Sequence, residues 1–132
     1  MASLVATASA CSGTGATKSA PPVTCSSISG VNDVNHHLTI SGCTGSPGGG
    51  GTVAAPFFSP SVIHWSGGGT TEVVFDPTPK LTSTPNCVNE ATVTGGKVDR
   101  TTIPSITGDF HASFCIDNAG NISLAPGTKM KF

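Results

Sequence analysis

Short runs of alternating apolar and polar residues, separated by clusters of Gly and Pro, recur along this chain and limit what it can fold into. The best example is 109–116, where Phe110, Ala112 and Phe114 fall on one face and polar side chains fall on the other. Side chains of a strand alternate between its two faces, so this pattern indicates a half-buried strand. No window repeats apolar residues at the spacing of an amphipathic helix. The sequence therefore predicts many short β-strands and almost no helix.

The number of strands narrows the fold class. The chain has 132 residues, a length typical of one domain. Many short antiparallel strands in one domain favour a two-sheet sandwich of the Ig-like type, with a small β-barrel as the alternative. We therefore predict a single all-β sandwich domain over residues 1–132.

The register of the first hairpin can be worked out from its side chains. We place Ile28 opposite Ile40, so that both isoleucines share one face. The same register brings Cys25 opposite Cys43 on the other face. Directly opposed Cβ atoms lie about 4.5–5.5 Å apart, close to the reach of a disulfide. We therefore expect a Cys25–Cys43 bridge.

A second hairpin surrounds a Gly-rich turn at 66–69. We place Ile63 opposite Val73, with Trp65 on the same face and His64 opposite Glu72 on the other. A slip of one residue would bring Glu72 opposite Ile63 and mix apolar with charged side chains, so we reject that register.

The remaining segments follow from their turn residues. We expect a strand at 87–94 that turns at Gly95-Gly96, and an irregular segment at 97–106. The Gly-rich stretch 45–51 is predicted to be a flexible loop, because it lacks the Lys-Ser/Thr and the helix of a phosphate-binding loop. Residues 129–132 are predicted to form a last edge strand, with lysines that discourage edge-to-edge pairing.

Five cysteines indicate an oxidising compartment, so we expect an extracellular or cell-surface protein.

Residues 4–11 are a candidate first strand. The alternative is that residues 1–10 are the remnant of a secretion signal, since Ala8-Ser9-Ala10 fits a small-residue cleavage site. A further alternative is a virion or particle protein made inside the cell, with free thiols.

Several functions are excluded by what the sequence lacks. Six Lys and Arg against seven Asp and Glu leave no basic stripe, so we expect no nucleic-acid partner. No run of about 18 apolar residues predicts a membrane span. The adjacent His36 and His37 would point to opposite faces of a strand, and no Cys-x-x-Cys is present, so we expect no metal. With no nucleophile elbow and few carboxylates, we expect no catalytic residues and no cofactor.

Three aromatic residues and one asparagine are candidate interaction sites. Phe57 and Phe58 are consecutive and cannot both face one core, so one of them is a candidate interface residue. Trp65 is a second interface candidate, although core packing accounts for it more readily. Asn121 begins an Asn-x-Ser sequon in a turn and is a candidate glycosylation site.

The segments HWSGGGTT (64–71), ATVTGG (91–96) and ISLAPGTK (122–129) resemble a group of small secreted all-β proteins of actinobacteria. The resemblance covers about half the chain and implies secretion and a β-sandwich, but no activity. Cysteines of that group would match Cys87 and Cys115. We prefer the pairs Cys87–Cys115 and Cys25–Cys43, which leave Cys11 over; pairing Cys11 with Cys25 or Cys43 remains an alternative.

These observations predict a secreted or surface-exposed, non-catalytic structural or binding module. Its expected partner is a protein or another macromolecule of a cell or virion surface, with homo-oligomerisation as a further expectation. The first alternative is a decoration protein of a virion or particle, and the second is a small secreted hydrolase.

Overall fold

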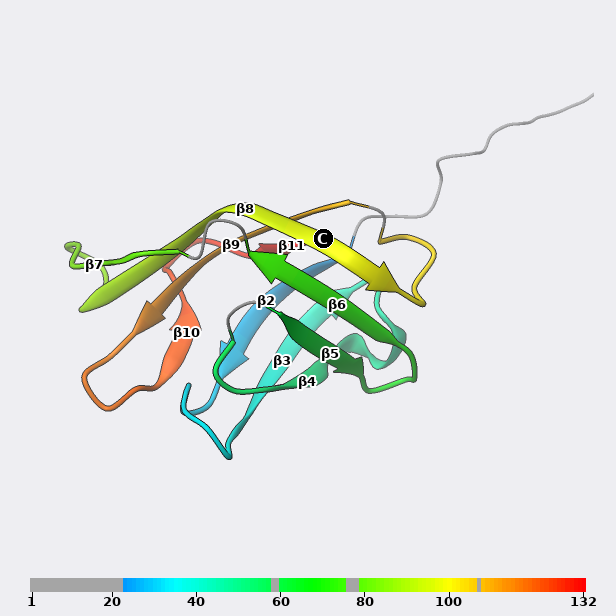
Figure 1. Cartoon of the computed structure of the whole chain (residues 1–132), viewed down its shortest axis with the longest axis horizontal. Coiled ribbons are helices and arrows are strands. Elements are labelled where there is room, and N and C mark those ends of the chain that lie inside the picture. The colour runs from blue at the N-terminus through cyan, green and yellow to red at the C-terminus, as the bar shows by residue number, and fades with distance from the viewer. Residues whose placement is uncertain (1–22, 58–59, 76–78, 107) are drawn as a thin grey trace, which may run out of the picture.

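The computed structural model describes residues 23–57, 60–75, 79–106 and 108–132 (Figure 1). The expected first strand at 4–11, Cys11 and Phe58 lie outside these residues. The described part is a ten-stranded antiparallel sheet with one short 3-10 helix, η3. Its elements are β2 Thr24–Ser29, β3 His37–Thr44, η3 Pro47–Gly49, β4 Gly51–Ala54, β5 Ser61–Trp65, β6 Thr70–Phe75, β7 Leu81–Thr82, β8 Asn89–Thr101, β9 Asp109–Ile116, β10 Ile122–Leu124 and β11 Met130–Lys131.

Eight of these strands close into a barrel, so the predicted two-sheet sandwich is wrong and the alternative fold describes the molecule. The ring runs β2-β3-β4-β5-β6-β8-β9-β11 and returns to β2. β11 closes it, because Met130 pairs with Cys25 of β2 and Lys131 pairs with His111 of β9. The expectation of a last edge strand at 129–132 is therefore also wrong. Alternation of apolar and polar residues is the same in a sandwich and a barrel, and only the pairing of the outermost strands distinguishes them.

Two short strands lie outside the ring. β7 pairs with the beginning of β8 through Leu81 opposite Ala91. β10 pairs with the end of β9 and also approaches the segment after β2, where the N–H of Ile122 donates to the carbonyl of Gly30 at 2.9 Å. β10 and β11 therefore both lie between β9 and β2, near opposite ends of these two strands.

β8 differs from its prediction. It runs without interruption from Asn89 to Thr101, so the turn expected at Gly95-Gly96 is wrong. The segment expected to be irregular, 97–106, is strand as far as Thr101 and irregular only after it. The pairing of β8 with β9 instead shifts between Val93 and Gly96, as in a β-bulge. A Cβ atom at Gly96 would lie 2.5 Å from the carbonyl oxygen of Phe110, so glycine permits this close approach. Gly-Gly therefore bends one strand here and does not join two strands.

The two hairpins agree with their predicted registers to different extents. The first has the predicted register, with Ile28 opposite Ile40 and Cys25 opposite Cys43. The cysteines do not lie on the opposite face, however, because Cys25 is fully buried with the isoleucines. The backbone leaves the extended conformation at Gly42, where φ is +64°, and this breaks the alternation along β3.

The second hairpin is shifted by two residues from its prediction. Ile63 lies opposite Thr71, and Glu72 lies opposite Val62. A shift of two preserves which side chains face the core, so the predicted faces are correct although the partners are wrong. The turn decides the register: the N–H of Trp65 donates to the carbonyl of Gly69, which has a φ of +95°.

The Gly-rich stretch 45–51 packs against this same turn. The N–H of Gly67 donates to the carbonyl of Pro47 at 3.0 Å, and the N–H of Ser66 donates to the carbonyl of Gly50 at 2.8 Å. A Cβ atom at Gly67 would lie 2.7 Å from the backbone of Pro47. The glycines of the two loops therefore permit direct backbone contact between them.

Apolar side chains fill the barrel. Phe57, from the segment between β4 and β5, is fully buried and meets Phe75, Phe110 and Phe114 edge to face. Trp65 is also buried. An eight-stranded barrel is just wide enough for its side chains to fill it. The other buried apolar residues include Val23, Ile28, Leu38, Ile40, Val53, Ile63, Val73, Val93, Ile106, Ala112, Ile122 and Met130.

Both expected disulfides are present. Cys25–Cys43 joins β2 to β3, and Cys87–Cys115 joins the segment before β8 to β9. Their Cα atoms are 3.9 and 5.2 Å apart. The first disulfide links two neighbouring strands of the ring. The second links β9 to the segment before β8, at the end of the molecule where β7 and β10 lie (Figure 1).

Candidate functional site

The aromatic residues singled out from the sequence do not form a described surface. Phe57 has no exposed area and Trp65 is only 4% exposed. The indole Nε1 of Trp65 donates to the hydroxyl of Thr71 at 2.8 Å, so its polar atom is also satisfied inside the barrel. Asn121 is exposed in the turn between β9 and β10, and its amide donates to the Asp117 carboxylate at 3.2 Å.

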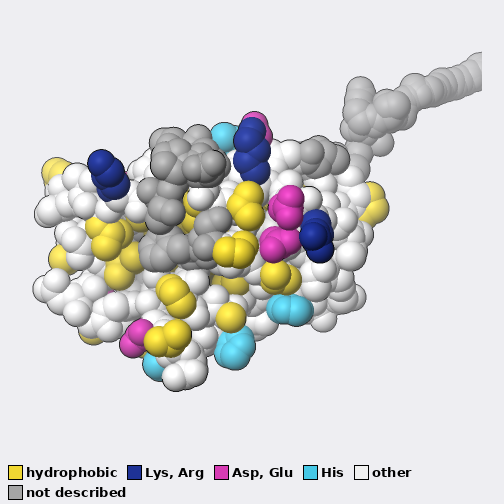
Figure 2. All heavy atoms as spheres, in the orientation of Figure 1, with side chains coloured by type: hydrophobic (Ala, Val, Ile, Leu, Met, Phe, Trp, Pro, Cys, Tyr) yellow, Lys and Arg dark blue, Asp and Glu magenta, His cyan; other side chains and the backbone are white. Residues whose placement is uncertain are grey.

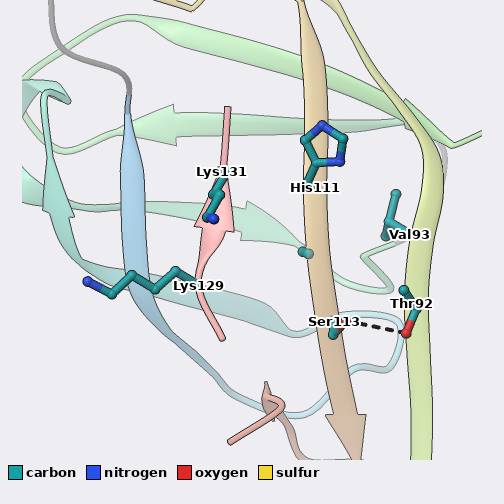
Figure 3. Close-up of a pocket in the computed structure, with 7 residues that line it drawn as sticks. Thr92, Val93, His111, Ser113, Lys129 and Lys131 are labelled. Atoms are coloured by element: carbon teal, nitrogen blue, oxygen red, sulfur yellow. Dashed lines mark hydrogen bonds between the residues drawn. The ribbon is translucent and has the colours of Figure 1, made fainter. Parts of the chain in front are cut away.

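A different group of side chains lines a shallow depression of about 250 Å³ on the outer surface of the barrel. The depression lies over β8, β9 and β11 (Figure 3). Its polar lining comes from Thr92, His111, Ser113, Lys129 and Lys131. We refer to these five residues as the β11 depression.

Strand register places these side chains on one face. Lys131 lies directly opposite His111 in the ladder between β11 and β9. Met130 is fully buried, so its neighbours Lys129 and Lys131 point outwards. Figure 3 shows Lys131 beside β9 and the long side chain of Lys129 extending over β2. Ring closure by β11 is therefore what brings Lys131 to β9.

Two hydroxyl groups form the other side of the β11 depression. Thr92 of β8 lies opposite Ser113 of β9, and their hydroxyl oxygens are 3.3 Å apart (Figure 3). Hydroxyl groups can both donate and accept hydrogen bonds, so this pair can bind a further polar group while keeping its mutual contact.

The charges in the β11 depression are unbalanced. Its lining contains no Asp or Glu. Two other cations are paired: Lys97 lies 3.5 Å from Asp109, and Arg100 lies 3.8 Å from Glu72. Among the described residues, neither Lys129 nor Lys131 forms an ion pair. Figure 2 shows one face of the molecule, where charged side chains are sparse; some lie beside a side chain of opposite sign and others stand apart.

A second depression, of about 380 Å³, adjoins the first and also includes Thr92. Its other lining residues are Lys80, just before β7, Thr82 of β7, Thr84 of the segment between β7 and β8, and Glu90 of β8. We refer to this site as the β7 depression. It combines one cation, one carboxylate and three hydroxyl groups.

The Cys87–Cys115 disulfide supports one wall of the β7 depression. The Thr84 hydroxyl accepts a hydrogen bond from the N–H of Cys87 at 3.1 Å, and the N–H of Thr84 donates to the carbonyl of Cys87 at 3.0 Å. This turn is held to β9 because Cys87 is bonded to Cys115. The bridge therefore positions Thr84 over the outer face of β8.

Within 23–57, 60–75, 79–106 and 108–132, no group of three or more His, Cys, Asp and Glu could hold a metal ion. In the same part of the chain, no helix is long and apolar enough to cross a bilayer.

Comparisons with known proteins give no match. No family model, no curated protein and no solved structure is similar to this chain at a significant level. The resemblance to secreted actinobacterial proteins therefore stays a prediction.

The β11 depression was not found from the sequence, although its pattern is visible there. Lys129-Met130-Lys131 and His111-Ala112-Ser113 both alternate between polar and apolar residues. From the sequence alone, the two lysines are expected to protect a free strand edge. Knowing that the 129–132 strand pairs with β9 would have placed both patterns on one surface.

Proposed function

We propose that this protein is an extracellular, non-catalytic binding module that holds anionic groups of a macromolecule at the β11 depression. The observation that carries this proposal is that two lysines without an ion pair, Lys129 and Lys131, line one depression that contains no carboxylate. Like charges on one face of a strand repel each other, and an anion bound between the two lysines would offset that repulsion.

The filled interior supports binding at the outer surface. Phe57, Phe110 and Phe114 have no exposed area, and they occupy the space that would hold a ligand in a wider barrel. Both described depressions lie on the outside and are shallow, which suits a segment of a large partner better than an enclosed small molecule.

The side chains of the β11 depression support binding and not hydrolysis. A nucleophilic serine requires a nearby base that is oriented by an acid. Here the Ser113 hydroxyl is hydrogen-bonded to Thr92, and the nearest acid along β9, Asp109, is paired with Lys97. His111 therefore has no orienting carboxylate in the lining.

The two disulfides support an extracellular location. Cys25–Cys43 and Cys87–Cys115 form and persist in oxidising compartments and are rare in the reducing cytosol. A titration of free thiols with and without denaturant, on protein isolated under alkylating conditions, tests this part of the proposal. Reduced Cys87 and Cys115 in the native protein would contradict it.

The anion site is tested with single charge variants. Binding of Lys131→Gln, Lys129→Gln and Arg100→Gln is measured by interferometry on immobilised polygalacturonate, chondroitin sulfate, duplex DNA and phosphatidylserine vesicles. Each variant lowers the formal net charge by one, and Arg100 is 84% exposed and lies outside both depressions. Arg100→Gln is therefore the matched control.

We expect the wild-type protein to bind at least one of these surfaces at low salt and to lose affinity as salt rises. Lys131→Gln is expected to weaken binding about two- to five-fold, as for an exposed ionic contact. Arg100→Gln should bind like the wild type. Equal losses in both variants would mean that only net charge matters, and no binding to any surface would refute the anion site.

A further inference from the structure

We infer that the anionic partner is an acidic polysaccharide, and that its chain crosses both depressions from β11 to β7. This inference rests on the proposed function and adds the chemical class of the ligand and its path. Thr92 lines both the β11 depression and the β7 depression, so the two depressions form one continuous track.

The track runs diagonally across four neighbouring strands in the order β11, β9, β8 and β7. It begins at Lys131 opposite His111, passes the Thr92 and Ser113 pair, and reaches Thr82 opposite Glu90. Strands lie about 4.8 Å apart, so three spacings and the shift along the strands give a track of roughly 15–20 Å. An extended oligomer fits this length better than a single small anion.

The chemistry along the track matches a polymer with many hydroxyl groups and well-separated negative charges. Cations stand at its two ends, with Lys131 in the β11 depression and Lys80 in the β7 depression. Between them lie the hydroxyl groups of Thr82, Thr92 and Ser113, which can exchange hydrogen bonds with sugar hydroxyls. The cations would then pair with carboxylate or sulfate groups on separated sugar units.

Glu90 is the residue that distinguishes a polysaccharide from a nucleic acid. It lies in the β7 depression with Lys80 and Thr82, where its carboxylate can accept hydrogen bonds from sugar hydroxyls. Duplex DNA carries one negative charge per roughly 1.7 Å of its axis, so Glu90 would repel it.

Single-stranded nucleic acids also require aromatic platforms for their bases. The large hydrophobic side chains exposed on the described surface are all aliphatic, namely Val34, Val62, Leu81 and Val88. The surface near the track therefore offers charge and hydroxyl groups without a base-stacking platform.

The path of the polysaccharide is tested by an NMR titration at low ionic strength with oligogalacturonates, from the dimer to the hexamer. Neutral maltohexaose is the uncharged control, and a DNA oligonucleotide and phosphatidylserine vesicles are the rival probes. We expect the amide signals of Thr92, His111 and Ser113 to shift with the acidic oligomers, and affinity to rise with length until the oligomer spans the track.

Two variants test the path. Lys80→Gln should weaken hexamer binding about two- to five-fold and leave dimer binding unchanged, because only the longer oligomer reaches β7. Lys131→Gln should weaken both. Arg100→Gln again controls for net charge, and the fluorescence of Trp65 confirms that each variant is folded.

The outcomes separate this inference from the proposed function. If DNA or vesicles bind through Lys131 and the galacturonates do not, the inference is wrong and the anion site stands. If Lys80→Gln leaves hexamer affinity unchanged, the path across β7 is wrong. If no anionic probe binds, or Lys131→Gln has no effect on any of them, both proposals fail.

Discussion

Replacing Phe57 with alanine tests whether a side chain from outside the strands holds the barrel interior together. Phe57 is fully buried, and its ring centre lies 5.4–6.1 Å from those of Phe75, Phe110 and Phe114. Removing a buried phenylalanine side chain costs about 3–5 kcal/mol. The irregular segment around residue 57 can move partly into the cavity, which lowers the cost, but three aromatic contacts of about 0.5–1.5 kcal/mol each are lost.

We therefore expect Phe57→Ala to lower the free energy of unfolding by about 4 kcal/mol, out of roughly 5–15 kcal/mol for a domain. Urea unfolding followed by Trp65 fluorescence measures this change in free energy. If the free energy of unfolding falls by about 2 kcal/mol per molar urea, the unfolding midpoint shifts by about 2 M. Trp65 is a suitable probe because, among the described residues, its ring packs against Phe132 and not against Phe57. Leu81→Ala is the control: Leu81 is 51% exposed, so we expect a change within about 0.5 kcal/mol.

A loss below about 1 kcal/mol for Phe57→Ala would refute the view that this ring stabilises the core. Light scattering on the same variant addresses the interface expected from the sequence. A change of oligomeric state without a change of stability would show that Phe57 contacts another molecule.

Three further predictions concern the bridges and polar contacts. Replacing both Cys25 and Cys43 with serine removes a link between residues 18 apart in sequence, and should cost about 3 kcal/mol in chemical unfolding. Thr71→Val leaves the buried indole N–H without its acceptor and should cost about 1–3 kcal/mol, whereas Thr70→Val should not. Hydrogen bonds from the backbone and side chain of Asn121 hold the pKa of Asp117 below its usual range. The charged form is therefore favoured in the folded state, and this stabilisation is lost as pH falls through the folded pKa. Melting temperatures at about pH 5 and pH 3 should fall less for Asp117→Asn than for the wild type; an equal fall would contradict the assignment.

The faces of most strands were predictable because they depend on local alternation; Cys25 is the exception, since it is buried together with Ile28. Phe110, Ala112 and Phe114 are all buried, as their spacing predicts. Register was less predictable, because a shift of two residues in the second hairpin keeps Ile63 and Val73 on the same face. The sequence pattern cannot decide between such registers, and the geometry of the Gly-rich turn does.

The closed ring was not predictable from local pattern. It depends on Met130 pairing with Cys25, more than a hundred residues earlier in the chain. The bend in β8 was missed for a related reason: Gly95-Gly96 is compatible with a turn and with a bulge, and the partner strand decides.

The candidate site depended on the same long-range pairing. Lys129 and Lys131 were noticed, but their role depends on which strand lies beside them. Once β11 is inserted between β2 and β9, Lys131 faces His111 and lies with Lys129 in one depression. The disulfides were more accessible, because Cys25 and Cys43 are opposed within one hairpin.

The late position of β11 in the chain has a consequence for biosynthesis. During translation β2 and β9 are complete before β11 leaves the ribosome, so each has an unpaired edge at that stage. The nascent protein would be vulnerable to association with other unfinished chains during that interval. A peptide tag fused after Phe132 would need a linker that preserves the hydrogen bond from the N–H of Phe132 to the carbonyl of Val23.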